Sequence, residues 1–182
     1  MTAPIPHLVL IGPRAAGKST LGALVAKRLD RLLIDLDELV RRRFNGATIA
    51  DIFTTHGQAS FREAELELLR EVLDRPPSII ALGGGAPMTP AARAMLADAR
   101  LAGRAFIIYL SAPAVVLQAR LRSADLSGRP SLTGRDPVDE VPEIIAARGP
   151  TYTSLADHTV ETDGCEVEEL AERLAAYVAG EN

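Results

Sequence analysis

A segment near the start of the chain combines residue types that can hold phosphate groups. Residues 12–19 read GPRAAGKS and fit the pattern G-x-x-x-x-G-K-[ST]. In this pattern the backbone N–H groups of the loop and the N-terminus of the next helix surround the phosphates of a nucleoside triphosphate. Lys18 is expected to reach the β- and γ-phosphates, and Ser19 to bind Mg²⁺. The alternative is a chance match in a glycine-bearing turn, and the motif alone does not say what is done with the nucleotide.

Two carboxylates follow a second apolar run. Asp35 and Asp37 come at the end of a strand predicted over residues 32–36, at the edge where parallel sheets place ligands. Because residues two apart in an extended chain point the same way, both carboxylates are expected to face one side. One is suited to hold Mg²⁺, directly or through water, and the other to accept a proton or hydrogen bond from a substrate hydroxyl. The alternative is that Asp37 only caps the following helix.

An arginine and a glutamate lie three residues apart in a helix predicted over residues 61–73. Arg62 and Glu65 therefore share one helical face. Taken locally, this spacing favours a surface ion pair worth about 0.2–0.5 kcal/mol over a part in a binding site.

Two further segments have compositions that favour ligand binding. Gly83, Gly84 and Gly85 follow a third apolar run. Three glycines in a row carry a large entropic cost, which indicates close approach of the backbone to a ligand, with a flexible connection as the alternative. Residues 123–137 are polar and rich in Gly, Pro and Arg, and have the length of a lid. An arginine on a closing lid would neutralise phosphoryl charge in the transition state.

The elements that must position these residues alternate between strand and helix. Apolar runs predict strands at residues 7–11, 32–36, 78–82, 104–110 and 158–161. Periodicity and terminal signals predict helices at residues 19–29, 38–43, 49–55, 61–73, 90–99, 113–122, 138–147, 150–156 and 167–178. This alternation is typical of a three-layer α/β/α fold, in which helices cover both faces of a five-stranded, mainly parallel sheet.

Length and composition exclude several classes of protein. The 182 residues carry 20 basic and 24 acidic side chains, which gives a net charge of −4, and 47% are hydrophobic. We expect one domain over residues 1–182, which buries about 70% of its surface on folding. The mildly acidic balance and the 4% aromatic content argue against nucleic acid as a partner. Cys165 is the only cysteine, and no apolar stretch reaches the roughly 20 residues of a membrane span. We expect a cytoplasmic monomer without membrane contact.

Taken together, the motifs resemble those of the shikimate kinase family over residues 5–178. The resemblance rests on residues 12–20, 35–37 (DLD), 56–58 (HGQ), 61–65 (FREAE), 81–85 (ALGGG), 129–132 (RPSL) and 148–152 (RGPTY). Many kinases share the first of these motifs, whereas the set as a whole is far more specific. The resemblance implies a P-loop kinase fold and transfer of the γ-phosphoryl group of ATP to the 3-hydroxyl of shikimate. It implies Mg²⁺ as the cofactor and a place in chorismate and aromatic amino-acid biosynthesis.

The resemblance also implies a role for each matching residue. ATP would be bound by Gly12, Pro13, Arg14, Ala15, Ala16, Gly17, Lys18, Ser19, Thr20, Arg120, which packs on the adenine, and Arg129, which comes from the lid. Shikimate would be bound by Asp37, Arg62, Gly83, Gly84, Gly85 and Arg148, with the two arginines gripping its carboxylate. Asp37 is the candidate base, and Lys18 and Arg129 are the other catalytic residues. Ser19 and Asp35 would hold the metal, and Glu65 would orient Arg62. Residues 38–74 would form the substrate-binding helical region, and 123–137 the lid.

Ala15 departs from the family pattern, which usually has glycine at this position. If the loop needs a positive φ there, the alanine costs about 1 kcal/mol. Gln58 and Thr151 replace a usual glutamate and leucine. None of the three removes a group that is expected to touch phosphate or substrate.

Two other functions fit parts of the sequence. A relative of gluconate or nucleotide kinases would keep the phosphate loop and phosphorylate another acceptor. The triple glycine with Arg62 and Arg148 speaks against it, although gluconate also carries a carboxylate. A kinase-like module could instead bind nucleotide or shikimate without turnover and serve a partner. Loss of Lys18, Asp37 or Arg129 would favour that function, and all three are present.

Overall fold

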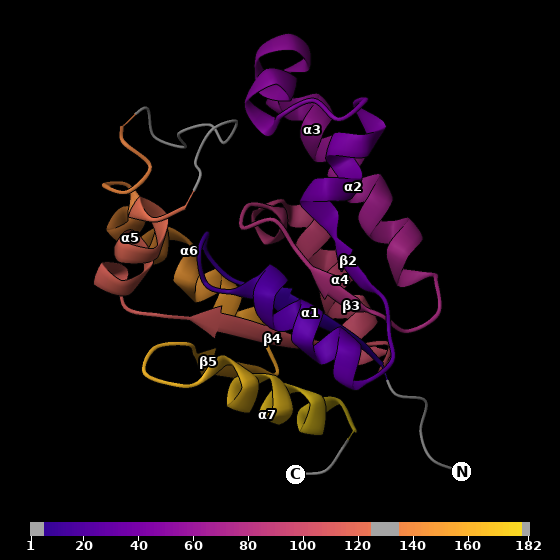
Figure 1. Cartoon of the computed structure of the whole chain (residues 1–182). Coiled ribbons are helices and arrows are strands. Elements are labelled where there is room, and N and C mark those ends of the chain that lie inside the picture. Colours follow the sequence, from indigo (N-terminus) through magenta and orange to yellow (C-terminus); the bar gives the residue numbers. More distant parts are fainter. Residues whose placement is uncertain (1–5, 125–134, 180–182) are drawn as a thin grey trace.

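A five-stranded parallel sheet forms the centre of the molecule. The computed structural model describes residues 6–124 and 135–179. Its strands are β1 (His7–Ile11), β2 (Leu33–Asp35), β3 (Ile79–Ala81), β4 (Ala105–Ser111) and β5 (His158–Glu161). They lie in the order β2-β3-β1-β4-β5, and every neighbouring pair is parallel. All the strands in Figure 1 therefore end at the same edge of the sheet.

Helices cover both faces of this sheet (Figure 1). They are α1 (Lys18–Arg28), α2 (Leu36–Arg43), α3 (Ile49–Leu73), α4 (Pro90–Leu101), α5 (Ala114–Arg122), α6 (Val141–Leu155) and α7 (Val167–Ala179), with a 3₁₀ turn, η1, at Ala86–Met88. Leu8 and Leu10 of β1 pack in a core with α1, α5 and α7, whereas Val9 and Ile11 pack in a second core with α2, α3 and α4. The two cores confirm the predicted three-layer α/β/α fold.

The central strand shows why the apolar runs of the sequence lack alternation. All five residues of β1 are buried, because helices cover both faces of the strand. The predicted bounds of β1 and β5 agree with the structure, and those of β3 and β4 agree to within one residue at each end. No helix within residues 6–124 and 135–179 is long and apolar enough to cross a membrane.

Helix α3 joins two segments that the sequence predicts as separate helices, 49–55 and 61–73. The element is interrupted at Gly57, where φ is 83° and ψ is 158°. This conformation is essentially open to glycine alone. The break therefore sets the angle between the two halves of α3, both of which reach the site described below.

Helix α6 likewise replaces two predicted pieces, 138–147 and 150–156. It runs without interruption through Pro150, although proline removes a backbone hydrogen-bond donor from the helix. Tyr152 and Leu155 anchor the second half of α6 in the core. Packing of this kind stabilises a helix more than local propensity does, which explains the difference.

Three loops that contain predicted site residues lie together because their strands adjoin. Residues 12–17 follow β1, and residues 83–85 follow β3. Asp35 is the last residue of β2, and residues 36 and 37 are the first two of α2. Since β3 lies between β1 and β2 and pairs with both in parallel, the three loops lie at one carboxyl edge of the sheet. The fold thus positions the candidate site.

Candidate active site

A cavity of about 230 Å³ opens at this edge of the sheet. It is lined by the phosphate loop, the start of α2, both halves of α3, the triple glycine and α6. Most of the predicted site residues line it: Arg14, Ala15, Gly17, Lys18, Ser19, Thr20, Asp35, Asp37, Arg62, Gly83, Gly84, Gly85 and Arg148. Ile49, Phe53 and Phe61 form an apolar wall that the sequence analysis missed. They reach the cavity because α3 turns at Gly57.

The phosphate loop places a cation against its own backbone. Gly12, Ala15 and Gly17 have positive φ values of 140°, 61° and 94°. Gly17 is also the residue that precedes α1, so the loop leads directly into a helix N-terminus. The ammonium of Lys18 donates to the carbonyls of Gly12 (2.8 Å) and Pro13 (2.7 Å). The positive φ expected at Ala15 is present, and it costs about 1 kcal/mol relative to glycine.

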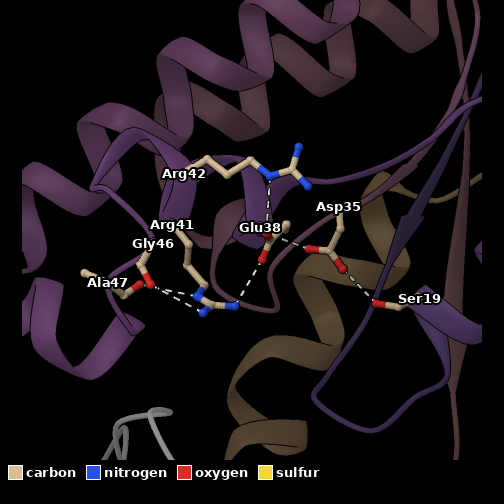
Figure 2. Close-up of polar contacts among 7 residues, drawn as sticks. All are labelled: Ser19, Asp35, Glu38, Arg41, Arg42, Gly46 and Ala47. Atoms are coloured by element: carbon tan, nitrogen blue, oxygen red, sulfur yellow. Dashed lines mark hydrogen bonds and ion pairs between the residues drawn. The ribbon is translucent and has the colours of Figure 1, made fainter.

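A hydroxyl and a carboxylate meet next to this loop (Figure 2). Ser19 Oγ donates to Asp35 Oδ2 at 2.8 Å, and Asp35 Oδ1 accepts from the backbone N–H of Glu38 at 3.3 Å. Glu38 in turn accepts from Arg41 (3.0 Å) and Arg42 (3.2 Å). Hard oxygen ligands of this kind suit Mg²⁺, which binds through one or two side chains and completes its coordination with phosphate and water. Within the described ranges no group of three or more His, Cys, Asp or Glu side chains is suited to a metal ion.

The sequence predicts that Asp35 and Asp37 share one side of an extended strand, and the structure shows that this prediction is wrong. Helix α2 begins at Leu36, so Asp35 is its N-cap and Asp37 lies in its first turn. The alternative that Asp37 caps the helix is also wrong, because Asp35 does so. Both carboxylates still line the cavity, but they reach it from a strand end and a helix start.

The triple glycine leaves room for polar side chains to pack against its backbone. A Cβ on Gly83 would overlap the Asp37 carboxylate and lie 3.1 Å from Glu65 Oε1. A Cβ on Gly85 would overlap the Arg62 guanidinium, and one on Gly84 would lie 3.3 Å from the carbonyl oxygen of Gly12. None of the three glycines has a positive φ. Space, and not backbone freedom, is therefore the physical reason for glycine here.

Glu65 is buried and Arg62 is half-buried, so the surface location that the local spacing favours for this pair is wrong. Arg62 Nη1 donates to Glu65 Oε2 at 2.6 Å, and the two side chains are only 20% and 3% exposed. Burial raises the pKa of the Glu65 carboxyl to about 7, Arg62 and Arg148 oppose this shift, and Asp37 adds to it. The local spacing could not reveal this burial, because Gly85 and Gly83, which lie against Arg62 and Glu65, come from elsewhere in the chain.

Helix α6 contacts the triple glycine through two residues one turn apart. Arg148 Nη1 and the hydroxyl of Tyr152 both donate to the carbonyl of Gly84, at 3.1 and 2.5 Å. Tyr152 is fully buried, and its ring centroid lies 5.1 Å from that of Tyr109. The sequence analysis gave Tyr152 no role. The i, i+4 spacing from Arg148 and the place of Tyr152 in the motif at residues 148–152 are the signals that point to it.

Among the predicted nucleotide-binding residues that the structure describes, four do not line this cavity: Gly12, Pro13, Ala16 and Arg120. Arg120 donates to the carbonyl of Ala15 (3.3 Å) and to the hydroxyl and carbonyl of Thr162 (2.9 and 2.6 Å). It thus connects the phosphate loop to the segment after β5, and its contact with adenine stays a prediction. Arg129 and most of the predicted lid fall within residues 125–134, which lie outside the described residues. Ala16 is fully buried in the core.

Comparison with known proteins places the chain in one family. The family model described as "Shikimate kinase" matches residues 14–179. The shikimate kinase of Nitratidesulfovibrio vulgaris is 37% identical over 96% of this chain and 99% of its own length, and shikimate kinase 2 of Syntrophotalea carbinolica is 41% identical over 85% and 86%. A solved structure of Acinetobacter baumannii shikimate kinase in complex with shikimate has a TM-score of 0.85 and 30% identity, and it covers 97% of this chain and 94% of the other. A gluconokinase from Sinorhizobium meliloti shares the fold alone, at 15% identity and a TM-score of 0.56. With its phosphate loop, its carboxylates and its arginines gathered in one cavity, the chain belongs to the shikimate kinase family.

Proposed function

We propose that the chain transfers the γ-phosphoryl group of ATP to the 3-hydroxyl of shikimate, giving shikimate 3-phosphate and ADP in chorismate and aromatic amino-acid biosynthesis. The observation that carries the proposal is the part of the cavity formed by residues 83–85 and the side chains around them, which we call the acceptor end. There Arg62 and Arg148, from two different helices, lie beside the same glycine loop as Asp37. Two guanidinium groups recognise a carboxylate, and a carboxylate oxygen accepts from hydroxyls, so this end fits a hydroxylated acid.

The other end of the cavity would hold ATP. The loop N–H groups and the N-terminus of α1 would surround its phosphates, and Lys18 would exchange the carbonyls of Gly12 and Pro13 for phosphate oxygens. Ser19 and Asp35 would hold Mg²⁺, which neutralises charge on the phosphates when it is bound. Arg129 is proposed to approach the phosphates from the lid.

The reaction needs little covalent chemistry from the protein. The acceptor oxygen forms a bond to the γ-phosphorus as the bond from that phosphorus to the β-bridging oxygen breaks, and ADP leaves. The hydroxyl proton passes to Asp37, which lies in the first turn of α2 against Gly83. The remaining residues position the two substrates and stabilise charge.

Arg62→Ala is expected to weaken shikimate binding about 10- to 150-fold, the equivalent of a lost charged hydrogen bond of about 1.5–3 kcal/mol. ATP affinity should not change, because Arg62 lies at the acceptor end. Titration calorimetry with each ligand separates the two effects. Arg43→Ala is the control, since Arg43 pairs with Glu67 on the surface. An unchanged dissociation constant for shikimate in Arg62→Ala would contradict the proposal that Arg62 binds the shikimate carboxylate.

Gly85→Ala is expected to weaken shikimate binding at least about tenfold without unfolding the protein, by displacing one charged hydrogen-bond donor. Gly85 has φ −95° and ψ −15°, which alanine adopts readily, so the backbone is not strained. The added Cβ would lie 2.9 Å from Arg62 Cζ and 3.0 Å from its Nη1, and it would displace the guanidinium. Gly149→Ala is the matched control, because no atom lies within 4 Å of its Cβ. Equal shikimate affinities in the two variants would contradict the packing argument.

The acceptor is tested by ADP release from purified protein with ATP and Mg²⁺. Reactions contain no acceptor, shikimate, gluconate or AMP. The proposal predicts strong stimulation by shikimate alone. Stimulation by gluconate or AMP would keep the kinase and change its substrate, and no stimulation of folded protein by any acceptor would favour a binding module.

A further inference from the structure

One oxygen in the cavity wall has no hydrogen-bond partner. Among the described residues, Glu65 Oε1 is the one buried side-chain nitrogen or oxygen atom without one. Glu65 is 2% exposed, and Oε1 points toward the side of Gly83 on which Asp37 lies. An unpaired buried carboxylate oxygen is costly, so it should gain a partner when the site is in use.

Three charged side chains influence the ionisation of the Glu65 carboxyl, and a fourth lines the same cavity. Arg62, on the same helix α3, donates to Glu65 Oε2, and the charge of Arg148 on α6 lowers the pKa of Glu65. The charge of Asp37 on α2 raises the pKa of Glu65, and Lys18 lines the same cavity at the phosphate end. Burial is the largest influence and raises the pKa of Glu65 to about 7, so both charge states are populated near neutral pH.

The charges at the acceptor end balance only while no anion is bound. Asp37 and an ionised Glu65 carry two negative charges against the two positive charges of Arg62 and Arg148. A bound carboxylate adds a third negative charge and draws on the same guanidinium that stabilises Glu65. It also replaces water in the cavity. Each of these changes favours the neutral form of Glu65.

We propose that Glu65 takes up a proton on Oε1 when an anionic acceptor binds, while its Oε2 continues to hold Arg62. The proton comes from the buffer, and a single O–H bond forms. The new O–H would lie on the side of Gly83 on which the Asp37 carboxylate lies, and Oε2 keeps its lone pairs for the guanidinium. The inference rests on the proposed function only in taking the acceptor to be a carboxylic acid. It makes Glu65 a positioning residue that couples affinity for an anionic acceptor to pH.

Proton uptake has a direct consequence for affinity. Between the pKa of Glu65 in the free protein and its higher pKa in the complex, the dissociation constant should rise toward tenfold per pH unit. A carboxylic acid ligand has an ordinary pKa near 4 and does not titrate above pH 6. Affinity should therefore fall as pH rises from about 6.5 to 8.5, without any change in ligand charge.

Titration calorimetry with shikimate, without nucleotide, tests the inference. Binding enthalpies measured at pH 7.5 in buffers of different ionisation enthalpy give the number of protons taken up. We expect uptake of about half a proton or more by the wild-type protein. Glu65→Gln should bind shikimate with no uptake and no pH dependence, because its amide oxygen can still accept from Arg62. His56→Gln is the control, because it introduces the same side chain at an exposed position of the same helix, α3.

The outcomes separate this inference from the function on which it rests. Binding of shikimate without proton uptake would overturn the inference alone, and so would equal uptake by wild type and Glu65→Gln. Loss of uptake in His56→Gln would assign the proton to that histidine and also overturn it. If folded wild-type protein does not bind shikimate, the proposed function fails first and the inference fails with it. If Glu65→Gln does not fold, the wild-type pH profile decides: an affinity that is flat from pH 6.5 to 8.5 overturns the proposal.

Discussion

Asp37→Asn is expected to lower kcat by about 10²–10⁴-fold, the range for loss of a positioned general base. Asparagine keeps the size of the side chain that packs against Gly83, but it cannot take a proton from the acceptor hydroxyl. ATP affinity should stay within about twofold of wild type, because Asp37 acts at the acceptor end and Ser19 is bonded to Asp35. Steady-state kinetics together with nucleotide titration measure both quantities.

The matched control for this substitution is Asp98→Asn, an exposed aspartate on α4. It changes the net charge of the protein by the same amount, but at a residue that does not line the cavity, and it should leave kcat unchanged. Turnover close to normal in Asp37→Asn would contradict a role for Asp37 as base. A loss of ATP binding as large as the loss of kcat would show that the residue acts on the nucleotide instead.

Lys18→Met should reduce kcat/KM for ATP by about 10²–10³-fold, the usual cost of removing one donor to charge that develops in the transition state. The ammonium already lies over the loop, held by the carbonyls of Gly12 and Pro13, so little reorganisation is needed for it to contact phosphate. Methionine keeps most of the apolar stem and removes only the charge. Affinity for shikimate alone should be unaffected.

The chain supplies a matched control for this prediction, because Lys27 is its only other lysine. Lys27 lies on the exposed side of the same helix, α1, and Lys27→Met should have wild-type kinetics. Equal activities for the two methionine variants would contradict a phosphate contact by Lys18.

The central strand could be predicted from the sequence because burial on both of its faces leaves an apolar run without alternation. Leu8 to Ile11 are apolar without alternation, and the strand ends at a glycine where the phosphate loop begins. The rule that parallel sheets bind ligands at their carboxyl ends then indicated where Asp35 and Asp37 would lie. These inferences need only short-range pattern and one general property of sheets.

Other features depend on contacts between distant segments, and the sequence pattern does not contain them. Arg62 and Glu65 have the spacing of a surface pair, but Gly85 lies against Arg62 and Gly83 against Glu65, some twenty residues later in the chain. Tyr152 meets the carbonyl of Gly84 across 68 residues of sequence. The predicted strand over residues 32–36 extends one residue beyond the end of β2, because a buried apolar residue such as Leu36 fits the end of a strand and the start of a helix equally well.

The acceptor itself could not be derived from residue types. Geometry and charge indicate a hydroxylated carboxylic acid, because two arginines and an aspartate converge on one glycine loop. Gluconate satisfies the same description. The choice of shikimate comes from the set of motifs beyond the phosphate loop and from the family to which they belong.

Transfer of a phosphoryl group to a carbon-bound hydroxyl is observed directly by ³¹P nuclear magnetic resonance of the reaction mixture. With protein, ATP, Mg²⁺ and shikimate, we predict that the γ-phosphate resonance disappears as one phosphomonoester resonance grows in equal amount, coupled to the proton on carbon 3 of the ring. Appearance of inorganic phosphate in place of the ester, or an unchanged γ-phosphate signal with folded protein, would contradict the account.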